Sequence, residues 1–309
     1  MFSHGVLHAS ATTTTAKASR ASSNSIAARH ALPVAVEALG ARDDSGASVL
    51  AQGVGRRFET SHGFVDACRD IDVLIPSGNF TVIVGPSGCG KSTFLRLVAG
   101  LDQPTSGTLS FTKASGGIPS NAMVFQGRSL YPWLTLRQNV AYGLQLQGWS
   151  RRARTERADE LLAVVGLSAF SKSYPQQVSE GMRQRVAIAR SLAVDPDILL
   201  MDEPFGALDE QTRFLLQEEL LRIWESTRKT VLFVTHSIDE AIVLADQIVV
   251  MSAQPGTSRA TLEVPFARPR SISDMRSDPA FGELFNTIWS ILREEVTSAR
   301  LAQEASLQR

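Results

Sequence analysis

The chain has 309 residues, of which 43% are hydrophobic and 20% charged, and its 31 basic and 31 acidic side chains cancel to a net charge of zero. The length allows about two domains, or one large α/β domain with appendages. The balanced charge disfavours a protein that coats nucleic acid or anionic lipid by general attraction. Two cysteines, Cys68 and Cys89, are too few for a disulfide framework, so we expect a reducing, cytosolic compartment.

Membrane spans are not expected from the sequence. The longest uninterrupted apolar runs, residues 161–165 and 241–245, are only five residues long. A helix that crosses hydrocarbon needs about 18 or more apolar residues.

The N-terminal segment, residues 1–46, differs in composition from the rest of the chain. Its first 30 residues include 17 Ala, Ser or Thr and no acidic residue. Such a segment has too few large apolar side chains to form a core, so we expect a disordered tail. The Arg-bearing, Ser-rich composition also resembles an organellar transit peptide, and composition alone leaves that alternative open.

From residue 48 onward, short strands alternate with helical periodicity. Apolar and polar side chains alternate over residues 65–75, up to the turn Pro76-Ser77-Gly78, which predicts a half-buried strand in an antiparallel arrangement. Later apolar runs are continuous, as expected for parallel strands covered on both faces by helices. These runs are residues 80–84, 123–125, 198–201, 231–234 and 248–251. Helices are predicted between them, including residues 155–165, 179–193, 210–226 and 238–245.

A glycine-rich loop lies between the first continuous apolar run and a helical run at residues 93–99. Residues 85–92 read Gly-Pro-Ser-Gly-Cys-Gly-Lys-Ser and fit the phosphate-binding pattern G-x-x-x-x-G-K-[ST]. Glycines let backbone N–H groups surround phosphates, Lys91 supplies a positive charge, and Ser92 can ligate Mg²⁺. An ordinary Gly-rich turn has no need of the Lys-Ser pair, so the loop predicts a nucleotide-phosphate site.

Two carboxylates follow the apolar run that begins at residue 198. Asp202 and Glu203 are then expected at the carboxyl end of a buried strand, the edge where open α/β sheets bind ligands. Asp202 can hold Mg²⁺ through its water shell, and Glu203 can orient and polarise an attacking water. Alone, such a pair more often caps the next turn. Together with the phosphate loop it predicts nucleotide hydrolysis.

Four further motifs resemble those of the ABC transporter ATPases. The family's signature motif is matched by Val178-Ser179-Glu180-Gly181-Met182-Arg183-Gln184-Arg185, and its Walker B motif by Asp202-Glu203-Pro204. Its D-loop is matched by Ala207-Leu208-Asp209, and its H-loop by Thr235-His236. The resemblance runs from about residue 48 to the C-terminal helix. It implies an α/β P-loop NTPase of the ABC ATPase type, with a mainly parallel core sheet, an antiparallel β subdomain and a helical signature subdomain. The implied organisation is a tail at 1–46, a nucleotide-binding domain at 47–265 with its helical subdomain at about 127–195, and a C-terminal linker and amphipathic helix at 266–309.

The resemblance also implies the roles of individual site residues. In this family two copies of the chain form a head-to-tail homodimer that holds two ATP molecules with Mg²⁺, each between the phosphate loop of one subunit and the signature helix of the other. Phe58 resembles the aromatic that stacks on adenine, although a core position would suit it equally. Gln126 resembles the Q-loop residue that touches Mg²⁺ or the attacking water, and His236 resembles the switch histidine that contacts the γ-phosphate. The implied nucleotide contacts are Phe58, Gly85, Pro86, Ser87, Gly88, Cys89, Gly90, Lys91, Ser92, Thr93, Ser179, Gly181, Met182 and Asp209; the implied metal ligands are Ser92, Gln126 and Asp202; the implied catalytic residues are Glu203, His236, Gln126 and Lys91.

One residue departs from the family pattern. Glu180 stands where the family usually has Gly. A carboxylate beside a nucleotide phosphate repels it unless the side chain points away, so we expect an active but slower site.

Two segments resemble the ATPases of nitrate, sulfonate and taurine importers in particular. Residues 129–134, Ser-Leu-Tyr-Pro-Trp-Leu, are similar to the segment on which such ATPases receive the permease's coupling helix. Packing of Trp133 inside its own helical subdomain is the alternative. Near the C-terminus, an apolar stripe predicts a helix packed on the nucleotide domain. The stripe consists of Phe281, Leu284, Phe285, Ile288 and Leu292.

The resemblance therefore implies a peripheral ATPase at the cytoplasmic face of the inner membrane. Its implied partners are integral membrane permease subunits and a periplasmic or lipid-anchored solute-binding protein, and no nucleic acid. Two alternatives stay open on the catalytic motifs alone: a soluble ABC ATPase of DNA repair or translation, and the ATPase of an ABC exporter.

Overall fold

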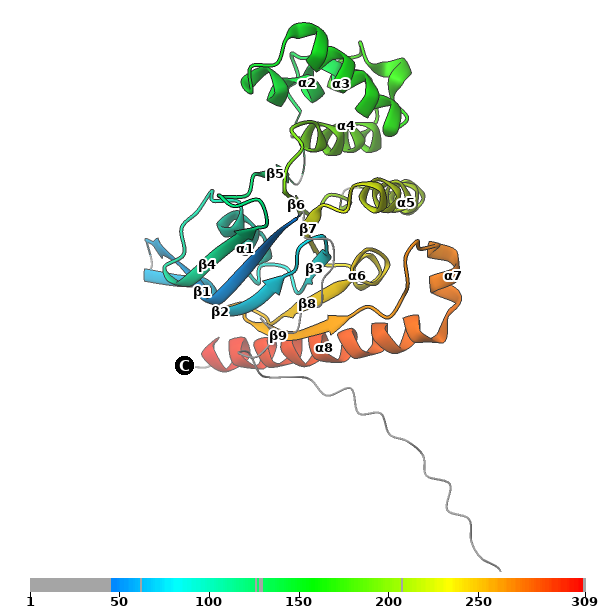
Figure 1. Cartoon of the computed structure of the whole chain (residues 1–309). Coiled ribbons are helices and arrows are strands. Elements are labelled where there is room, and N and C mark those ends of the chain that lie inside the picture. The colour runs from blue at the N-terminus through cyan, green and yellow to red at the C-terminus, as the bar shows by residue number, and fades with distance from the viewer. Residues whose placement is uncertain (1–45, 62, 126, 128–129, 207, 308–309) are drawn as a thin grey trace, which may run out of the picture.

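The computed structural model describes residues 46–61, 63–125, 127, 130–206 and 208–307. Two sheets and several surrounding helices make up the larger part of the molecule, and a separate group of helices stands at one end (Figure 1). The tail predicted at 1–46 falls almost entirely outside the described residues.

The central sheet has six strands in the order β5-β6-β7-β3-β8-β9. All neighbours are parallel except the edge pair β8 and β9, which is antiparallel. The mainly parallel core predicted from the continuous apolar runs is confirmed. The strands are β3 (Phe80–Val84), β5 (Asn121–Val124), β6 (Ile198–Asp202), β7 (Thr230–Thr235), β8 (Gln247–Met251) and β9 (Ser258–Glu263).

Both faces of this sheet are covered, which explains why its strands lack alternation. In β7, Val231 and Phe233 belong to one hydrophobic core, whereas Leu232 and Val234 belong to a second core on the opposite face. Every residue of β3, β6 and β7 is buried. Successive side chains therefore alternate between two cores rather than between core and solvent.

A second, antiparallel sheet has three strands in the order β2-β1-β4. They are β1 (Ala47–Thr60), β2 (Gly63–Ile75) and β4 (Ser106–Lys113). The alternation over residues 65–75 predicted β2 correctly. Strand β4 was not predicted, although Leu109 and Phe111 alternate with polar residues and pack half-buried against the second core.

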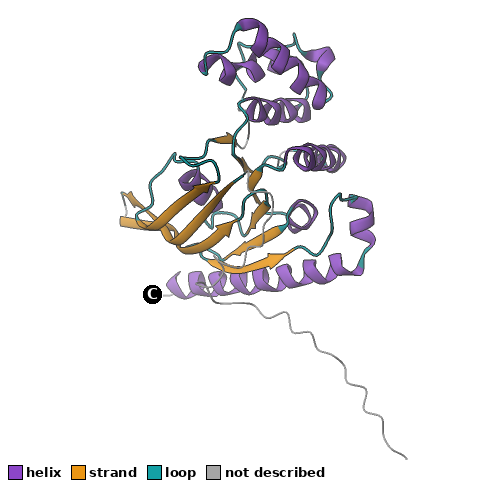
Figure 2. Cartoon of the chain, in the orientation of Figure 1, coloured by secondary structure: helices purple, strands orange, loops and turns teal. Residues whose placement is uncertain are grey.

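The helices fall into two groups (Figure 2). One group surrounds the central sheet: α1 (Lys91–Val98), α5 (Glu210–Thr227), α6 (Ile238–Leu244), α7 (Ile272–Ser277) and α8 (Pro279–Leu307). The other forms the separate helical part: α2 (Leu136–Leu146), α3 (Arg151–Val164), α4 (Glu180–Ala193) and the 3₁₀ turns η1 (Ser168–Phe170) and η2 (Pro175–Gln177). The antiparallel and helical subdomains implied by the family resemblance are thus present.

Several predicted boundaries were wrong. The strand expected at 123–125 ends at Val124, and Phe125 lies outside it with 43% of its surface exposed. The helix expected from residue 155 begins at Arg151, because Ser150 caps it, its hydroxyl accepting from the Ala153 N–H at 3.2 Å. The helix expected from residue 93 begins at Lys91, directly after Gly90 in the left-handed conformation.

The C-terminal stripe packs as predicted. Phe281, Ile288 and Leu292 are buried in the main core, and Leu284 and Phe285 pack against it half-buried. Helix α8 contacts α6 and β8. Among the residues the structure describes, no helix, α8 included, is long and apolar enough to span a bilayer.

A buried arginine ties the segment before α7 to the end of α6. Arg270, with 1% of its side chain exposed, donates to the carbonyl oxygens of Ala245 at 2.7 Å and Phe266 at 3.0 Å. It also lies 3.5 Å from Asp246 Oδ1. Burial, together with the neighbouring Arg268 charge, lowers the pKa of Arg270 to about 10, so the guanidinium is charged at neutral pH.

We expect Arg270→Ala to lower the free energy of unfolding by about 3 kcal/mol, because it leaves the carbonyl oxygens of Val243, Ala245 and Phe266 without this donor and removes one of the two guanidinium groups beside Asp246. Urea unfolding followed by circular dichroism measures the loss. Arg293→Ala on the exposed side of α8 is the matched control and should change stability by less than about 0.5 kcal/mol. Equal stability of the two variants would contradict the assigned role of Arg270.

Asp197, just before β6, gives stability that depends on pH. Burial of this carboxylate is outweighed by hydrogen bonds from Lys113 Nζ at 2.8 Å and from the Ser120 N–H at 2.7 Å, so its pKa is lowered from the ordinary value. A carboxyl with a lowered pKa in the folded state stabilises the protein above the unfolded-state pKa, near 4, and this contribution is lost as pH falls through the folded-state value.

We therefore expect Asp197→Asn to cost about 1 to 2 kcal/mol of folding free energy at pH 7 and progressively less below about pH 4. Urea unfolding at a series of pH values measures this difference. Asp70→Asn is the control, since Asp70 has 74% of its side chain exposed and a 3.7 Å ion pair with Arg69, which contributes little. A cost at Asp197 that stays constant down to pH 2.5 would contradict the account.

Candidate active site

The predicted phosphate loop connects the end of β3 to the start of α1. Gly88 and Gly90 both adopt positive φ, at 77° and 97°, a conformation that glycine adopts without strain. Lys91 is buried, and its Nζ donates to the carbonyl oxygens of Gly85 at 2.9 Å and Pro86 at 2.8 Å. The ammonium group is thus held at the loop itself, next to the N-terminus of α1, where an anion is favoured.

Two segments, one in β2 and one before β9, pack closely against the loop. A Cβ on Gly90 would lie 2.3 Å from the carbonyl oxygen of Ala67 in β2, and one on Gly256 would lie 1.9 Å from that of Cys89. Only glycine allows these approaches. The Cys89 side chain is buried, and burial raises the pKa of its thiol. Of Cys89, only the backbone is therefore available to a phosphate.

The two carboxylates at the end of β6 have different surroundings. Asp202 Oδ1 accepts a hydrogen bond from Ser92 Oγ at 2.7 Å. Burial raises the pKa of the Asp202 carboxyl, and the Ser92 hydrogen bond opposes this effect. A hydroxyl and a carboxylate oxygen placed side by side at the phosphate loop are ligands of the kind that Mg²⁺ prefers, so the residues present fit this ion.

Glu203 follows with a backbone φ of 41°, uncommon for a residue with a side chain. Its N–H donates to the Val234 carbonyl oxygen of β7 at 3.0 Å, which holds this conformation. Its Oε1 lies 3.9 Å from Lys91 Nζ, and its Oε2 lies 3.1 Å from His236 Nδ1. The left-handed backbone is strained, as is common where a side chain must be aimed at a reaction site.

His236 comes directly after β7, the strand next to β6 and β3. The structure thus brings Lys91, Ser92, Asp202, Glu203 and His236 to the same carboxyl edge of the sheet. The predicted phosphate, metal and catalytic residues converge, although they lie far apart in the sequence.

Sequence reasoning missed Glu240, which anchors the segment that carries His236. Glu240 Oε2 accepts from Thr235 Oγ1 at 2.6 Å, and its Oε1 lies 3.5 Å from Arg213. Burial raises the pKa of this carboxyl. The S-x-x-E pattern of Ser237 and Glu240 at the start of α6 is a helix-capping signal that could have drawn attention to it.

Phe58 lies on β1, opposite Val65 of β2. It is half-buried, and the Arg56 guanidinium stacks over its ring at 4.7 Å. Arg56 in turn lies opposite Cys68, whose Cβ is 3.2 Å from the position that a Cβ on Gly90 would take. Phe58 lies two residues further along β1 than Arg56, and therefore further from Gly90 along the strand. This position beside the phosphate loop suits an adenine-stacking role.

The signature residues lie at the start of α4, in the helical part and away from α1 (Figure 1). The Ser179 hydroxyl caps the helix by accepting from the Met182 N–H at 3.3 Å. A Cβ on Gly181 would lie 2.6 Å from Thr212 Cγ2, so glycine permits the contact with α5. Met182 packs half-buried against the main core. The structure does not bring these residues to the phosphate loop of the same chain.

Two predicted residues need separate mention. Asp209 caps α5: its Oδ1 accepts from the Thr212 N–H at 2.9 Å, and this hydrogen bond is the first cause of its lowered pKa. Gln126 lies outside the described residues.

The site combines a phosphate loop with a buried lysine, a serine–aspartate pair, and a strained glutamate beside a histidine. Together these features fit the binding and hydrolysis of a nucleoside triphosphate. Comparison with known proteins agrees. Residues 68–206 match the ABC transporter family. The chain is 45% identical over 251 residues to the nitrate import ATP-binding protein NrtD of Synechocystis, an alignment that covers 79% of this chain and 94% of the relative. It is 40% identical over 254 residues to the taurine import ATP-binding protein TauB of Roseobacter denitrificans, with the same coverage of 79% and 94%.

Solved structures show the same fold. A dimeric ATP-binding cassette, MJ0796, in a post-hydrolysis state bound to ADP and Pi, aligns with a TM-score of 0.62 and 32% identity, covering 71% of this chain and all of that one. The chain belongs to the ABC transporter ATPase family. It is an ATPase that binds ATP, and the fold class predicted from the motifs is confirmed.

Proposed function

We propose that this ATPase is the energy-coupling subunit of an importer for small oxyanion-bearing solutes of the nitrate, taurine or other sulfonate type. The observation that carries the proposal is the extent of the likeness to nitrate and taurine import ATP-binding proteins, which covers 79% of the chain at 45% and 40% identity. A soluble ABC ATPase of DNA repair or translation and an exporter ATPase find no such support among these relatives.

The site residues divide the chemistry between them. Lys91 and the loop N–H groups bind the β- and γ-phosphates, and Ser92 and Asp202 would hold Mg²⁺, which neutralises phosphate charge when bound. Glu203 accepts a proton from the attacking water. His236, 3.1 Å from Glu203 Oε2, orients that carboxylate and faces the γ-phosphate. Phe58 would stack on adenine, and Gln126, which lies outside the described residues, is proposed to touch the metal or the water.

We infer that the working unit is a head-to-tail homodimer. Ser179 and Gly181, which lie away from the phosphate loop of their own chain (Figure 1), would close over the nucleotide of the other subunit with the N-terminus of α4 as a second anion site. Asp209 would lie in the same interface. The dimeric state of the solved relative supports this arrangement.

Trp133 is the proposed anchor for the permease. It has 70% of its surface exposed, and its ring lies beside the Tyr131 ring, with centroids 5.6 Å apart and the ring planes tilted by 43°. The alternative of a Trp buried within the helical subdomain is therefore wrong. An exposed aromatic of this size is a frequent anchor at protein interfaces. We infer a peripheral position at the cytoplasmic face of the inner membrane, beside integral permease subunits fed by a solute-binding protein.

Co-purification tests this proposal. The chain is expressed with the membrane protein and solute-binding protein encoded beside its gene, and ATP-dependent uptake of nitrate, taurine and an alkanesulfonate into proteoliposomes is measured. We expect uptake of one of them, and we expect Trp133→Ala to reduce permease binding roughly tenfold or more while the ATPase rate of the isolated chain is unchanged. Trp289→Ala, at another exposed tryptophan (52% exposed) on α8, is the control. Export of solute, or a complete lack of a membrane partner, would contradict the proposal.

A further inference from the structure

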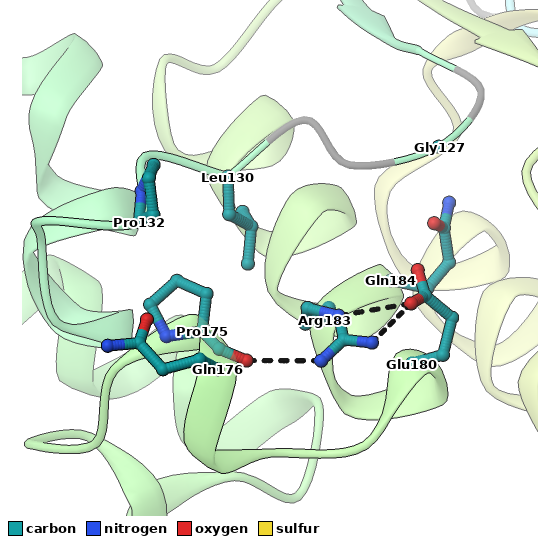
Figure 3. A pocket seen from close by; sticks show the side chains of 8 residues that line it. All are labelled: Gly127, Leu130, Pro132, Pro175, Gln176, Glu180, Arg183 and Gln184. Carbon is teal, nitrogen blue, oxygen red and sulfur yellow. Dashed lines mark hydrogen bonds and ion pairs between the residues drawn. The ribbon is translucent and has the colours of Figure 1, made fainter.

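Glu180 and Arg183 lie one turn apart at the start of α4, and their side chains form an ion pair (Figure 3). Arg183 Nε donates to Glu180 Oε2 at 3.1 Å, and Nη2 donates to the same oxygen. Arg183 Nη1 also donates to the carbonyl oxygens of Pro175 at 3.1 Å and Val178 at 2.6 Å. One guanidinium therefore joins the Glu180 carboxylate to the segment that leads into the signature helix.

The first turn of α4 faces two different cavities. Glu180 and Arg183 line the cavity of Figure 3, of about 470 Å³. Ser179 and Gly181 line another, of about 420 Å³, together with Thr212 of α5. The Glu180 carboxylate thus lies on a different side of the helix from the Ser179 hydroxyl and the Gly181 backbone.

This arrangement changes the expectation of a slower site. Repulsion between Glu180 and a phosphate requires an unpaired carboxylate aimed at the phosphate. Here the carboxylate is paired with a guanidinium, which cancels most of its field at a distance, and it faces the other cavity. The structure gives no support to an electrostatic penalty from Glu180.

The guanidinium also fixes the residue before the helix cap. Val178 directly precedes Ser179, and its carbonyl oxygen is held by Arg183. Ser179 is held from the other side by the Met182 N–H. The position of the Ser179 hydroxyl therefore depends on Arg183, and the direction of the Arg183 fork depends on Glu180.

We propose that Glu180 and Arg183 form a clasp that positions Ser179 for ATP-driven closure of the dimer, with Arg183 as a positioning residue that does not touch the nucleotide. The inference rests on the proposed function, in which the signature helix of one subunit closes over ATP bound to the other. Lysine cannot replace Arg183 fully, since it lacks the planar fork that reaches the carboxylate and two carbonyl groups together.

The test measures dimerisation and nucleotide binding separately. Full-length Glu203→Gln protein, which should hydrolyse ATP at least about a hundredfold more slowly, is the parent for Glu180→Gln, Arg183→Gln, Arg183→Lys and the Glu180→Gln, Arg183→Gln double variant. Sedimentation velocity at saturating Mg-ATP gives the dimer dissociation constant, and titration with a fluorescent ATP analogue at low protein concentration gives the affinity of the monomer. Arg157→Gln is the matched control, because Arg157 and Glu160 form an exposed pair with the same i, i+3 spacing at 3.1 Å.

We expect Arg183→Gln to weaken the dimer about tenfold and Glu180→Gln about threefold, with monomer affinity for the analogue unchanged. The double variant should be no weaker than Arg183→Gln, because the two residues act together, and Arg183→Lys should recover only part of the loss. Arg157→Gln should change neither quantity.

Three results would overturn the clasp. A tighter dimer in Glu180→Gln would show that the carboxylate repels phosphate. Additive losses in the double variant would show that the two side chains act independently. A parallel fall in monomer affinity would show a general loosening of the fold. If the Glu203→Gln parent itself stays monomeric, the proposed dimeric function fails, a result distinct from these three.

Discussion

Glu203→Gln should bind ATP as tightly as the unaltered protein and hydrolyse it at least about a hundredfold more slowly. Removal of a general base typically costs two to four orders of magnitude in rate. Glutamine keeps the size of the side chain and can still contact His236, now 3.1 Å from the carboxylate, but it cannot accept a proton from water. The phosphate loop and the Ser92–Asp202 pair are unaltered, so nucleotide binding should persist.

Phosphate release and equilibrium binding of a fluorescent ATP analogue measure the two quantities. Glu240→Gln is an informative comparison, since Glu240 supports the His236 segment from the buried side, through Thr235 at 2.6 Å. It should lower the rate by a smaller factor, about tenfold. Unchanged turnover in Glu203→Gln would remove this residue as the base.

Lys91→Ala should abolish measurable ATP binding. The ammonium group is buried at the loop, bonded to the Gly85 and Pro86 carbonyl oxygens, and is positioned to transfer hydrogen bonds to phosphate oxygens. Hydrogen bonds to charged groups contribute about 1.5 to 3 kcal/mol each, so the loss of two corresponds to roughly a hundredfold or more in the dissociation constant.

Titration with the same analogue measures the change, and circular dichroism checks that the variant is folded. Lys229→Ala is the control, because Lys229 pairs at 2.9 Å with the exposed Asp195 and should leave binding unaltered. Near-normal affinity in a folded Lys91→Ala protein would mean that the nucleotide binds elsewhere.

Much of this site was predictable because its residues follow strands whose apolar composition indicates that they are buried. The runs before residues 85, 202 and 236 are apolar except for Thr81 and Thr235, and parallel strands of one sheet bring their carboxyl ends to one edge. Lys91, Asp202 and Glu203 could therefore be predicted to lie together, whereas His236 was assigned to the site only by the resemblance to the ABC transporter ATPases.

Three features were not predicted, although each has a weak local signal in the sequence. Strand β4 carries only two large apolar side chains, Leu109 and Phe111, and both are only half-buried, so its alternation is short and weak. Helix α2 was missed although Thr135 and Gln138 form a capping box. The Glu180–Arg183 pair was not anticipated, because Glu180 was compared with a family pattern and not with the residue one turn later. In the structure Glu180 is paired with Arg183, and the rate effect expected of Glu180 stays a prediction.

The central claim is that two copies of the chain hold ATP between the phosphate loop of one and the start of α4 of the other. Sedimentation velocity of Glu203→Gln with and without saturating Mg-ATP, compared with a Glu203→Gln, Ser179→Arg variant, tests it most directly. The account predicts a nucleotide-dependent dimer with two bound ATP molecules, and a monomer that still binds ATP when Ser179 is replaced. A parent that remains monomeric with ATP bound, or a dimer unaffected by Ser179→Arg, would contradict it.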